Sequence, residues 1–277
     1  EHGFDPLCEE AKQYLKNSGA LFGTPIERLQ HMNPGAIALY GSHGIDLTRE
    51  KLEVAVCAQH MNGGIAVDCH WQTDVEGLYV CGEAAGTFGA YRPGGSALNA
   101  TQVGSRRAAE AIAYGQKRKP IGEARFRELA ERALAALPSP RMGDASNLDA
   151  RILEAQRAMS ASAAHVRDLS AMNETARMIR SRIQEDGVRL CNESELPRYY
   201  QYRDTLITQY AMLSAMAASA ERCGSRASAL VLDEKGVEPP VLRGQYRMRP
   251  ARRAAANEAL ISQLGPDGEV RSHFEPV

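Results

Sequence analysis

Glu83 and the glycine-rich stretch after it could build a nucleotide-type binding site. The stretch Gly77–Gly82 before it is apolar and bounded by glycines, which predicts a strand. A loop of glycine and small residues then runs to Gly95, and a helix is expected to start at Ser96 or Asn99. A strand, a glycine-rich loop and a helix start in this order are typical of a nucleotide-type site.

Each part of this layout offers a physical role. A carboxylate at Glu83 can accept hydrogen bonds from the hydroxyl groups of a cofactor. Gly94 and Gly95 allow the backbone to pass close to a flat ring. The residues Ser96–Leu98 open a helix whose unpaired N–H groups and positive dipole end can face a negatively charged ring edge. The alternatives are a glutamate that only caps a helix and an ordinary glycine-rich helix N-terminus.

The elements before this segment are predicted to be helix and loop. A helical pattern runs from Asp5 to about Asn17. Thr24-Pro25 is typical of an N-cap followed by the first helical residue, and this helix should stop before Asn33-Pro34-Gly35. Short strands are then expected at Val54–Ala58 and at Ile65–Asp68.

The second half of the chain has the periodicity of helices. The helix after the glycine-rich loop should run to about Tyr114, with an apolar stripe of Val103, Ala108, Ala111 and Ile112. A polar break at Lys117–Pro120 marks a domain boundary. Three helices are predicted beyond it, with short turns that favour an antiparallel bundle; they are Glu123–Leu137, Leu148–Glu185 and Glu195–Cys223. Short strands and an extended tail are expected from Ser225 to Val277.

Composition excludes several classes of protein. The chain has 277 residues, a formal net charge of -1 and 44% hydrophobic residues, as expected for a globular protein that binds no nucleic acid. No apolar run approaches the length of a membrane span. The six cysteines form no CxxC pair, so we expect them to be reduced and buried in a reducing, cytoplasmic compartment. The chain starts at Glu1 rather than Met, which suggests a partial or processed protein.

A metal site is not favoured by the spacing of the candidate ligands. Cys57, His60, Cys69 and His70 could be combined as zinc ligands, but adjacent residues on a strand point to opposite sides. We therefore expect no metal. The basic run Arg247–Arg253 has no interleaved aromatic residues and is interpreted as a solvated tail.

Three pieces in fixed order resemble the fumarate reductase and succinate dehydrogenase flavoprotein family. They are His60 followed by Gly63-Gly64, the TxVxGLYxxGE pattern of Thr73–Glu83, and the stretch Arg92–Leu98. Any one of them would be a weak motif, whereas the ordered set over about 50 residues is specific.

The resemblance implies FAD as the cofactor and a substrate that carries a carboxylate. It implies that His60 and Arg92 hold the substrate carboxylate while hydride passes between flavin N5 and the carbon chain, positioning the substrate rather than acting as nucleophiles. Arginine suits this role because its planar fork pairs with a carboxylate through two hydrogen bonds. The residues implied to contact FAD are Glu83, Gly94, Gly95, Ser96, Ala97 and Leu98.

The sequence also departs from the family's pattern. Phe88 and Tyr91 stand where the family often has histidine and asparagine, which predicts a larger or more apolar substrate pocket. No GxGxxG motif follows a strand, so the ADP-binding half is expected upstream of this chain. The family's arginine proton donor has no match in residues 1–59. We expect this part alone to be flavin-free and inactive.

The predicted fold class is α/β plus α, a partial Rossmann-like FAD-binding domain followed by an antiparallel helical bundle and an irregular tail. The expected boundaries are 1–55 for the end of a capping domain, 56–118 for the FAD-binding part, 119–230 for the bundle and 231–277 for the tail. The alternatives for function are a relative that acts on another substrate, such as an amino-acid oxidase or a ketosteroid dehydrogenase, or a helical module that docks an electron-transfer protein.

Overall fold

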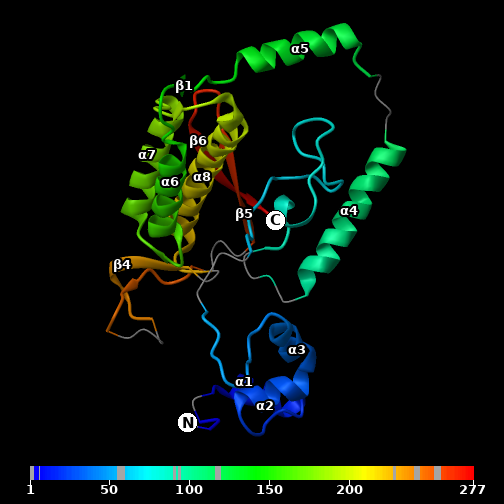
Figure 1. The fold of residues 1–277 in the computed structure, drawn as a ribbon, viewed down its shortest axis with the longest axis vertical. Helices are drawn as coiled ribbons and strands as arrows, with labels where there is room; N and C mark the ends of the chain where they lie inside the picture. Colours follow the sequence, from blue (N-terminus) through cyan, green and yellow to red (C-terminus); the bar gives the residue numbers. More distant parts are fainter. Residues whose placement is uncertain are drawn as a thin grey trace. The chain divides into compact units, whose positions relative to one another are not determined.

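The computed structural model describes residues 3–5, 7–54, 60–89, 92, 95–115, 120–226, 229–239, 244–252 and 257–277. Contacts divide the chain into two compact units, Glu1–Cys57 and Ala58–Val277, and each is considered by itself. Figure 1 traces the elements of both units along the chain. Within the described ranges, no helix is both long enough and apolar enough to cross a membrane.

The first unit consists of helices α1 (Glu9–Asn17), α2 (Pro25–Met32) and α3 (Pro34–Ser42). The start predicted from Thr24-Pro25 is confirmed. The Thr24 hydroxyl accepts the Glu27 N–H, and the Glu27 carboxylate accepts the Thr24 N–H at 2.6 Å, so each satisfies a backbone donor of the other. Helix α1 ends at Asn17 as predicted but begins four residues later than Asp5.

Helix α3 is an element that the sequence prediction misses. The Asn33-Pro34-Gly35 run does end α2, but it also starts the next helix. The Asn33 side chain accepts the Ala36 N–H at 3.3 Å, and Pro34 occupies the first helical position, where a missing N–H costs no hydrogen bond. Helices α2 and α3 pack against each other.

The glycine-rich segment is irregular where strands were predicted. Ile65–Asp68 forms no strand, and Gly77–Gly82 is reduced to one antiparallel bridge between Gln72 and Tyr79. The reason is local competition, because the Asp68 carboxylate accepts the Gln72 N–H at 3.0 Å and so closes a turn. The strand predicted at Val54–Ala58 lies outside the described residues except for Val54, which is not in a strand.

Helix α4 (Ser96–Tyr114) begins at the earlier of the two predicted starts and ends as predicted. Its predicted apolar stripe is partly wrong. Ala108 is buried, but the side chains of Val103 and Ile112 are 55% and 60% exposed. The buried side of α4 is made of small residues instead.

Trp71 explains why that side of α4 must be small. A Cβ atom added at Gly104 would lie less than 3.0 Å from the Trp71 indole, so glycine is needed for the ring to pack on the helix. The guanidinium of Arg107 lies 5.7 Å from the centre of the same ring. Trp71 thereby connects the irregular segment to α4.

The predicted long helix Leu148–Glu185 is two helices. They are α6 (Leu148–Ala163) and α7 (Leu169–Gln184). Between them the chain extends into strand β2 (Val166–Arg167), and the Asp168 side chain caps α7 by accepting the Ala171 N–H at 2.8 Å. Continuous helical periodicity could not reveal this break, because the connecting strand is only two residues long.

The remaining helices agree better with prediction. Helix α5 (Glu123–Ala135) and helix α8 (Leu196–Cys223) form in the predicted ranges, and a short 3₁₀ helix η2 (Glu193–Glu195) precedes α8. Gly224, with a φ of +68°, ends α8 as predicted.

Helices α6, α7 and α8 lie side by side and enclose the apolar core of the second unit (Figure 1). Met172, Leu206, Leu213 and Ile179 are each 0% exposed within it. Helix α5, in contrast, contributes no buried residue.

Short strands complete the second unit. The pair β1 (Arg141–Met142) and β3 (Arg189–Leu190) is parallel, as are β2 and β4 (Leu230–Val237). Strands β5 (Glu258–Leu264) and β6 (Val270–Pro276) form an antiparallel hairpin that packs on α8. The strands predicted beyond Ser225 are therefore present and more regular than a tail.

The prediction that the cysteines are buried is mostly wrong. Cys223 is buried, but Cys8, Cys69 and Cys191 are exposed and Cys81 is half-buried. These five cysteines form no disulfide among the described residues, and Cys57 lies outside them.

Candidate active site

His60 and Glu83, two of the predicted site residues, are in direct contact. Nδ1 of His60 lies 2.9 Å from Oε2 of Glu83. The other carboxylate oxygen, Oε1, accepts the backbone N–H of Met61 at 2.7 Å. Both oxygens of one side chain therefore hold the same short segment, 22 residues earlier in the sequence.

The charge of Glu83 is stabilised by its surroundings. The Met61 N–H lowers the pKa of the Glu83 carboxyl most strongly, and the nearby charges of His60 and Arg92 lower this pKa further. Glu83 is therefore an anion at neutral pH. The influence of Arg92 on Glu83 also brings the third predicted residue into the neighbourhood of the pair.

Backbone contacts fix the segment of His60 against the short 3₁₀ helix η1 (Gly82–Ala85), which carries Glu83. The Ile65 N–H donates to the carbonyl of Ala84 at 2.8 Å. A Cβ atom added at Gly64 would lie less than 3.0 Å from backbone atoms of Gly86 and Ala84, and one at Gly86 would meet Gly64 equally closely. Gly64, from the motif that contains His60, thus touches Gly86, from the loop that follows Glu83.

Helix α4 packs against η1, the short helix that carries Glu83. Gly82 has a φ of +69° and lies against Thr101 of α4. A Cβ atom added at Gly82 would lie 3.3 Å from the methyl group of Thr101. Gly95 precedes the helix in the left-handed region, with a φ of +80°. The first turn of α4 carries no acidic residue, and no side chain among the described residues caps its N-terminus.

The predicted cofactor residues are only partly covered by the structure. Ser96 and Ala97 are half-buried small residues in the first turn of α4, and the Leu98 side chain is 73% exposed. Gly94 lies outside the described residues. The structure brings His60 and Glu83 into contact, and Arg92 within electrostatic reach of Glu83.

Phe88 and Met61 are site residues whose contacts the sequence interpretation misses. The ring centres of Phe88 and His60 are 5.3 Å apart, with the planes tilted by 33°. The Phe88 ring therefore limits how the imidazole can rotate. Its aromatic type was a usable signal, but no pattern links position 88 to position 60.

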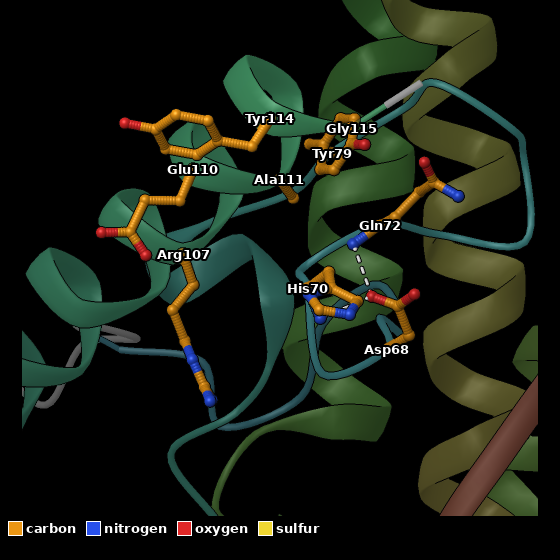
Figure 2. Close-up of a pocket in the computed structure, with 9 residues that line it drawn as sticks. All are labelled: Asp68, His70, Gln72, Tyr79, Arg107, Glu110, Ala111, Tyr114 and Gly115. Carbon is orange, nitrogen blue, oxygen red and sulfur yellow. Dashed lines mark hydrogen bonds between the residues drawn. The ribbon is translucent and has the colours of Figure 1, made fainter.

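A separate cavity of about 570 Å³ lies at the other end of α4 (Figure 2). It is lined by Asp68, His70, Gln72, Tyr79, Arg107, Glu110, Ala111, Tyr114 and Gly115. None of the predicted site residues is among them. A search of the described residues for groups of histidine, cysteine and acidic side chains able to hold a metal finds none.

The sequence matches known flavoproteins over its first third. Residues 6–98 match the FAD binding domain family. L-aspartate oxidase of Streptomyces coelicolor is 34% identical over 115 residues, which are 41% of this chain and 18% of that protein. One of the subunits of the CoM/CoB fumarate reductase of Methanothermobacter marburgensis is 44% identical over 66 residues, 24% of this chain and 12% of that protein.

The similarity in fold to solved structures covers most of the chain, whereas the family match covers its first third. FrdA of the E. coli quinol fumarate reductase matches with a TM-score of 0.66 and 22% identity, over 97% of this chain and 47% of that one. The Sdh1 complex of Mycobacterium smegmatis matches with a TM-score of 0.61 and 19% identity, over 90% of this chain and 41% of that one. The chain spans about half the length of the structures it matches, and less than a fifth of either sequence relative is aligned.

The resemblance drawn from the ordered motifs is therefore confirmed at the level of the family. Residues 6–98 are similar in sequence to the FAD binding domain family, parts of the chain are similar to an L-aspartate oxidase and a fumarate reductase subunit, and most of the chain shares the fold of the fumarate reductase and succinate dehydrogenase flavoproteins.

Proposed function

We propose that this chain is the C-terminal part of an FAD-dependent oxidoreductase that transfers hydride between flavin N5 and a carboxylate-bearing substrate. The observation that carries the proposal is the contact between His60 and Glu83, with Arg92 in electrostatic reach, beside a glycine-rich helix start. A donor, an anion and a fixed cation at such a helix start suit a flavin and an organic acid together.

The start of α4 fits a flavin ring. Gly95 lets the backbone approach a flat group, and the N–H groups of the following turn point out of the helix with no acidic side chain in that turn. When bound, the flavin supplies the hydride chemistry. The helix N-terminus would stabilise the negative charge on the pyrimidine edge of a reduced flavin.

Glu83 has capacity left for a cofactor. Each of its oxygens accepts a hydrogen bond from the described segment of His60 and Met61, and a carboxylate offers about four acceptor positions. Its side chain is 50% exposed, so a ribityl hydroxyl could reach the remaining positions. In our proposal Ser96, Ala97 and Leu98 follow the ring edge, and Gly94, which lies outside the described residues, also contacts the cofactor.

His60 and Arg92 are the proposed ligands of the substrate carboxylate. The Nε2 atom of His60 is buried and has no hydrogen-bond partner among the described residues. A buried polar atom without a partner costs about 1–3 kcal/mol, so its presence favours a ligand at this position. Arg92 would add a fixed positive charge and orient the acid group for reaction at the flavin.

The substrate is less constrained than the chemistry. Phe88 places an aromatic ring beside His60, which favours a larger or less polar substrate than a C4 dicarboxylate. One sequence relative is named an L-aspartate oxidase and another a fumarate reductase, which keeps both an amino acid and an unsaturated diacid as candidates. A ketosteroid, which carries no carboxylate, belongs to the alternative in which the enzyme acts on another class of substrate.

The domain assignment is part of the proposal. Residues 1–55 would close a capping domain, 56–118 would complete a Rossmann-like FAD domain whose ADP-binding half lies upstream, 119–230 would form an antiparallel bundle and 231–277 a strand-containing tail. A cytoplasmic location and an electron-transfer partner belong to the same expectation. An exposed apolar stripe on α8 would favour a docking module, but Leu206 and Leu213 are fully buried there.

The test uses the full-length protein that contains this chain, reconstituted with FAD. Visible absorbance reports bound flavin, and turnover is measured with fumarate, succinate and L-aspartate using artificial electron donors and acceptors. Arg92→Lys should retain the flavin spectrum but lose about 100-fold or more in kcat/KM, because lysine cannot form the two parallel hydrogen bonds.

Arg106→Lys is the matched control, since Arg106 pairs with Glu110 on the surface of α4 at 2.8 Å. It should behave like the wild type. A full-length protein that binds no flavin, or an Arg92→Lys variant with unchanged kcat/KM on a carboxylate it turns over, would contradict the proposal.

A further inference from the structure

The contact between Glu83 and His60 has a consequence for the state of the imidazole. We infer that Glu83 is a positioning residue that fixes His60 with its proton on Nδ1 and its Nε2 atom available to the substrate. The role of Nε2 rests on the proposed function, whereas the fixed proton on Nδ1 follows from the contact of the imidazole with an ionised Glu83.

The direction of the hydrogen bond follows from the charge of Glu83. An ionised carboxylate can only accept hydrogen bonds, so the proton between Oε2 and Nδ1 must belong to the histidine. The backbone N–H of Met61 and the charges nearby keep Glu83 ionised by lowering its pKa. In a neutral ring with the proton on Nδ1, Nε2 carries a lone pair instead of a hydrogen.

Three contacts keep the pair in this geometry. The Met61 N–H holds the second oxygen of Glu83 at 2.7 Å, which prevents the carboxylate from turning away. The Phe88 ring lies against the imidazole at 5.3 Å between centres. The mutual approach of Gly64 and Gly86 fixes the two backbone segments that carry the pair. The His60 side chain is only 12% exposed as a result.

This arrangement makes substrate binding depend on a proton. Nε2 can donate to a substrate carboxylate only when the ring is doubly protonated, because Nδ1 already holds the proton that faces Glu83. Among the described residues, Arg92 is the other charged side chain whose field reaches Glu83. Once the second ring proton is lost, Nε2 has no hydrogen to donate, so affinity for a carboxylate should fall as the pH rises.

The first experiment reads the proton position directly. Full-length, flavin-loaded protein carrying isotope-labelled histidine is studied by heteronuclear NMR of the imidazole nitrogens, at a pH where the ring is neutral. His60→Gln identifies the His60 signal among the seven histidines of this chain and any upstream ones. The expected wild-type signal is that of the Nδ1–H form.

Glu83→Ala should abolish this preference, because the acceptor for Nδ1–H is gone. Glu110→Ala removes a carboxylate that pairs with Arg106 instead, and it should leave the His60 signal unchanged. A wild-type His60 with its proton on Nε2, or a Glu83→Ala variant with the same Nδ1–H signal as the wild type, would overturn the inference.

The second experiment separates positioning from cofactor binding. For any carboxylate that the enzyme turns over, Glu83→Gln measured at saturating FAD should raise KM about tenfold with a smaller change in kcat, the size expected for one charge-assisted hydrogen bond. A loss of flavin with KM unchanged would assign Glu83 to the cofactor alone and refute the positioning role.

The two experiments fail in different ways. If no carboxylate is turned over, the proposed function fails while the NMR signal still decides whether Glu83 fixes His60. If turnover is found but His60 carries its proton on Nε2, the proposed function stands and the positioning role is wrong.

Discussion

The core of helices α6–α8 and the glycine-rich segment 60–95 are held together by different means. In the helical core, large side chains such as Leu206 and Met172 are fully buried and fill the space between helices. In the segment, backbone meets backbone, as where Gly64 lies against Gly86, and most of the described side chains remain exposed. One region is stabilised by apolar area and the other by close approach and hydrogen bonds.

The difference decides which changes each region can tolerate. An apolar core accepts other side chains of similar volume, because its energy depends on filling space. A contact between two backbones accepts almost none, because any Cβ atom would push the two segments apart. The candidate site lies in the second kind of region, where His60 and Glu83 are placed by glycine contacts. This explains why the site is recognisable as a motif and the core is not.

The largest expected effect is a truncation in the helical core. Leu206→Ala should lower the free energy of unfolding by about 2–5 kcal/mol, because a fully buried leucine is replaced by a cavity. Urea denaturation followed by far-UV circular dichroism measures the change. Ile207→Ala is the matched control, since its side chain is 36% exposed, and it should cost clearly less. Equal losses in the two variants would show that α8 is not packed as described.

A substitution at the contact between Gly64 and Gly86 should cost less stability than Leu206→Ala but disturb the candidate site more. Gly64→Ala should cost about 1–3 kcal/mol of local stability, because the new methyl group would overlap backbone atoms of Gly86. Limited proteolysis and the flavin spectrum of the full-length protein measure the result. The adjacent Gly63→Ala is the control, because no atom lies within 4 Å of a Cβ added there. If both variants kept the spectrum and the protease resistance of the wild type, the glycine contact would be unimportant.

The same contrast explains what the sequence could predict. Helices α4, α5 and α8 follow from periodicity and from their ends, such as Gly224 after α8, because these signals are local. The break between α6 and α7 could not be predicted, because Val166–Arg167 becomes a strand only by pairing with Leu230–Val237, far along the chain. Helix α3 escapes prediction when Asn33-Pro34 is interpreted only as a stop, although the same residues also make a good start.

In the candidate site, the sequence predicts the family and misses the geometry. The order of His60, Glu83 and Arg92 indicated a resemblance to a flavoprotein family, and the comparisons find the same similarity. The strands predicted at Ile65–Asp68 and Gly77–Gly82 do not form, because Gly and turn-forming residues replace a ladder with single hydrogen bonds. The contact of Glu83 with His60 was not foreseen, because it depends on Gly64 meeting Gly86, and motif spacing carries no information on which glycines touch.

The smallest effect is expected at Glu195, a carboxylate that accepts a backbone N–H as Glu83 does. Glu195, at the start of α8, accepts the Cys191 N–H at 2.8 Å, much as Glu83 accepts that of Met61. The Ser146 hydroxyl and then the Cys191 N–H lower the pKa of Glu195 from 4.5 to about 2. A carboxyl with a lowered pKa stabilises the fold above its unfolded value, and this stabilisation is lost as the pH falls from 4.5 towards 2.

Glu195→Gln should therefore flatten the loss of stability between pH 4.5 and about 2, because glutamine does not titrate. The effect should be small, since solvent screens an accessible carboxylate. Thermal unfolding measured across this pH range gives the slope for the variant and the wild type. The control is Glu193→Gln, which changes a neighbouring exposed acid in the same 3₁₀ helix and should keep the wild-type slope. A flattened slope in both variants would show that the acid sensitivity comes from net charge rather than from the hydrogen bonds of Glu195 at the start of α8.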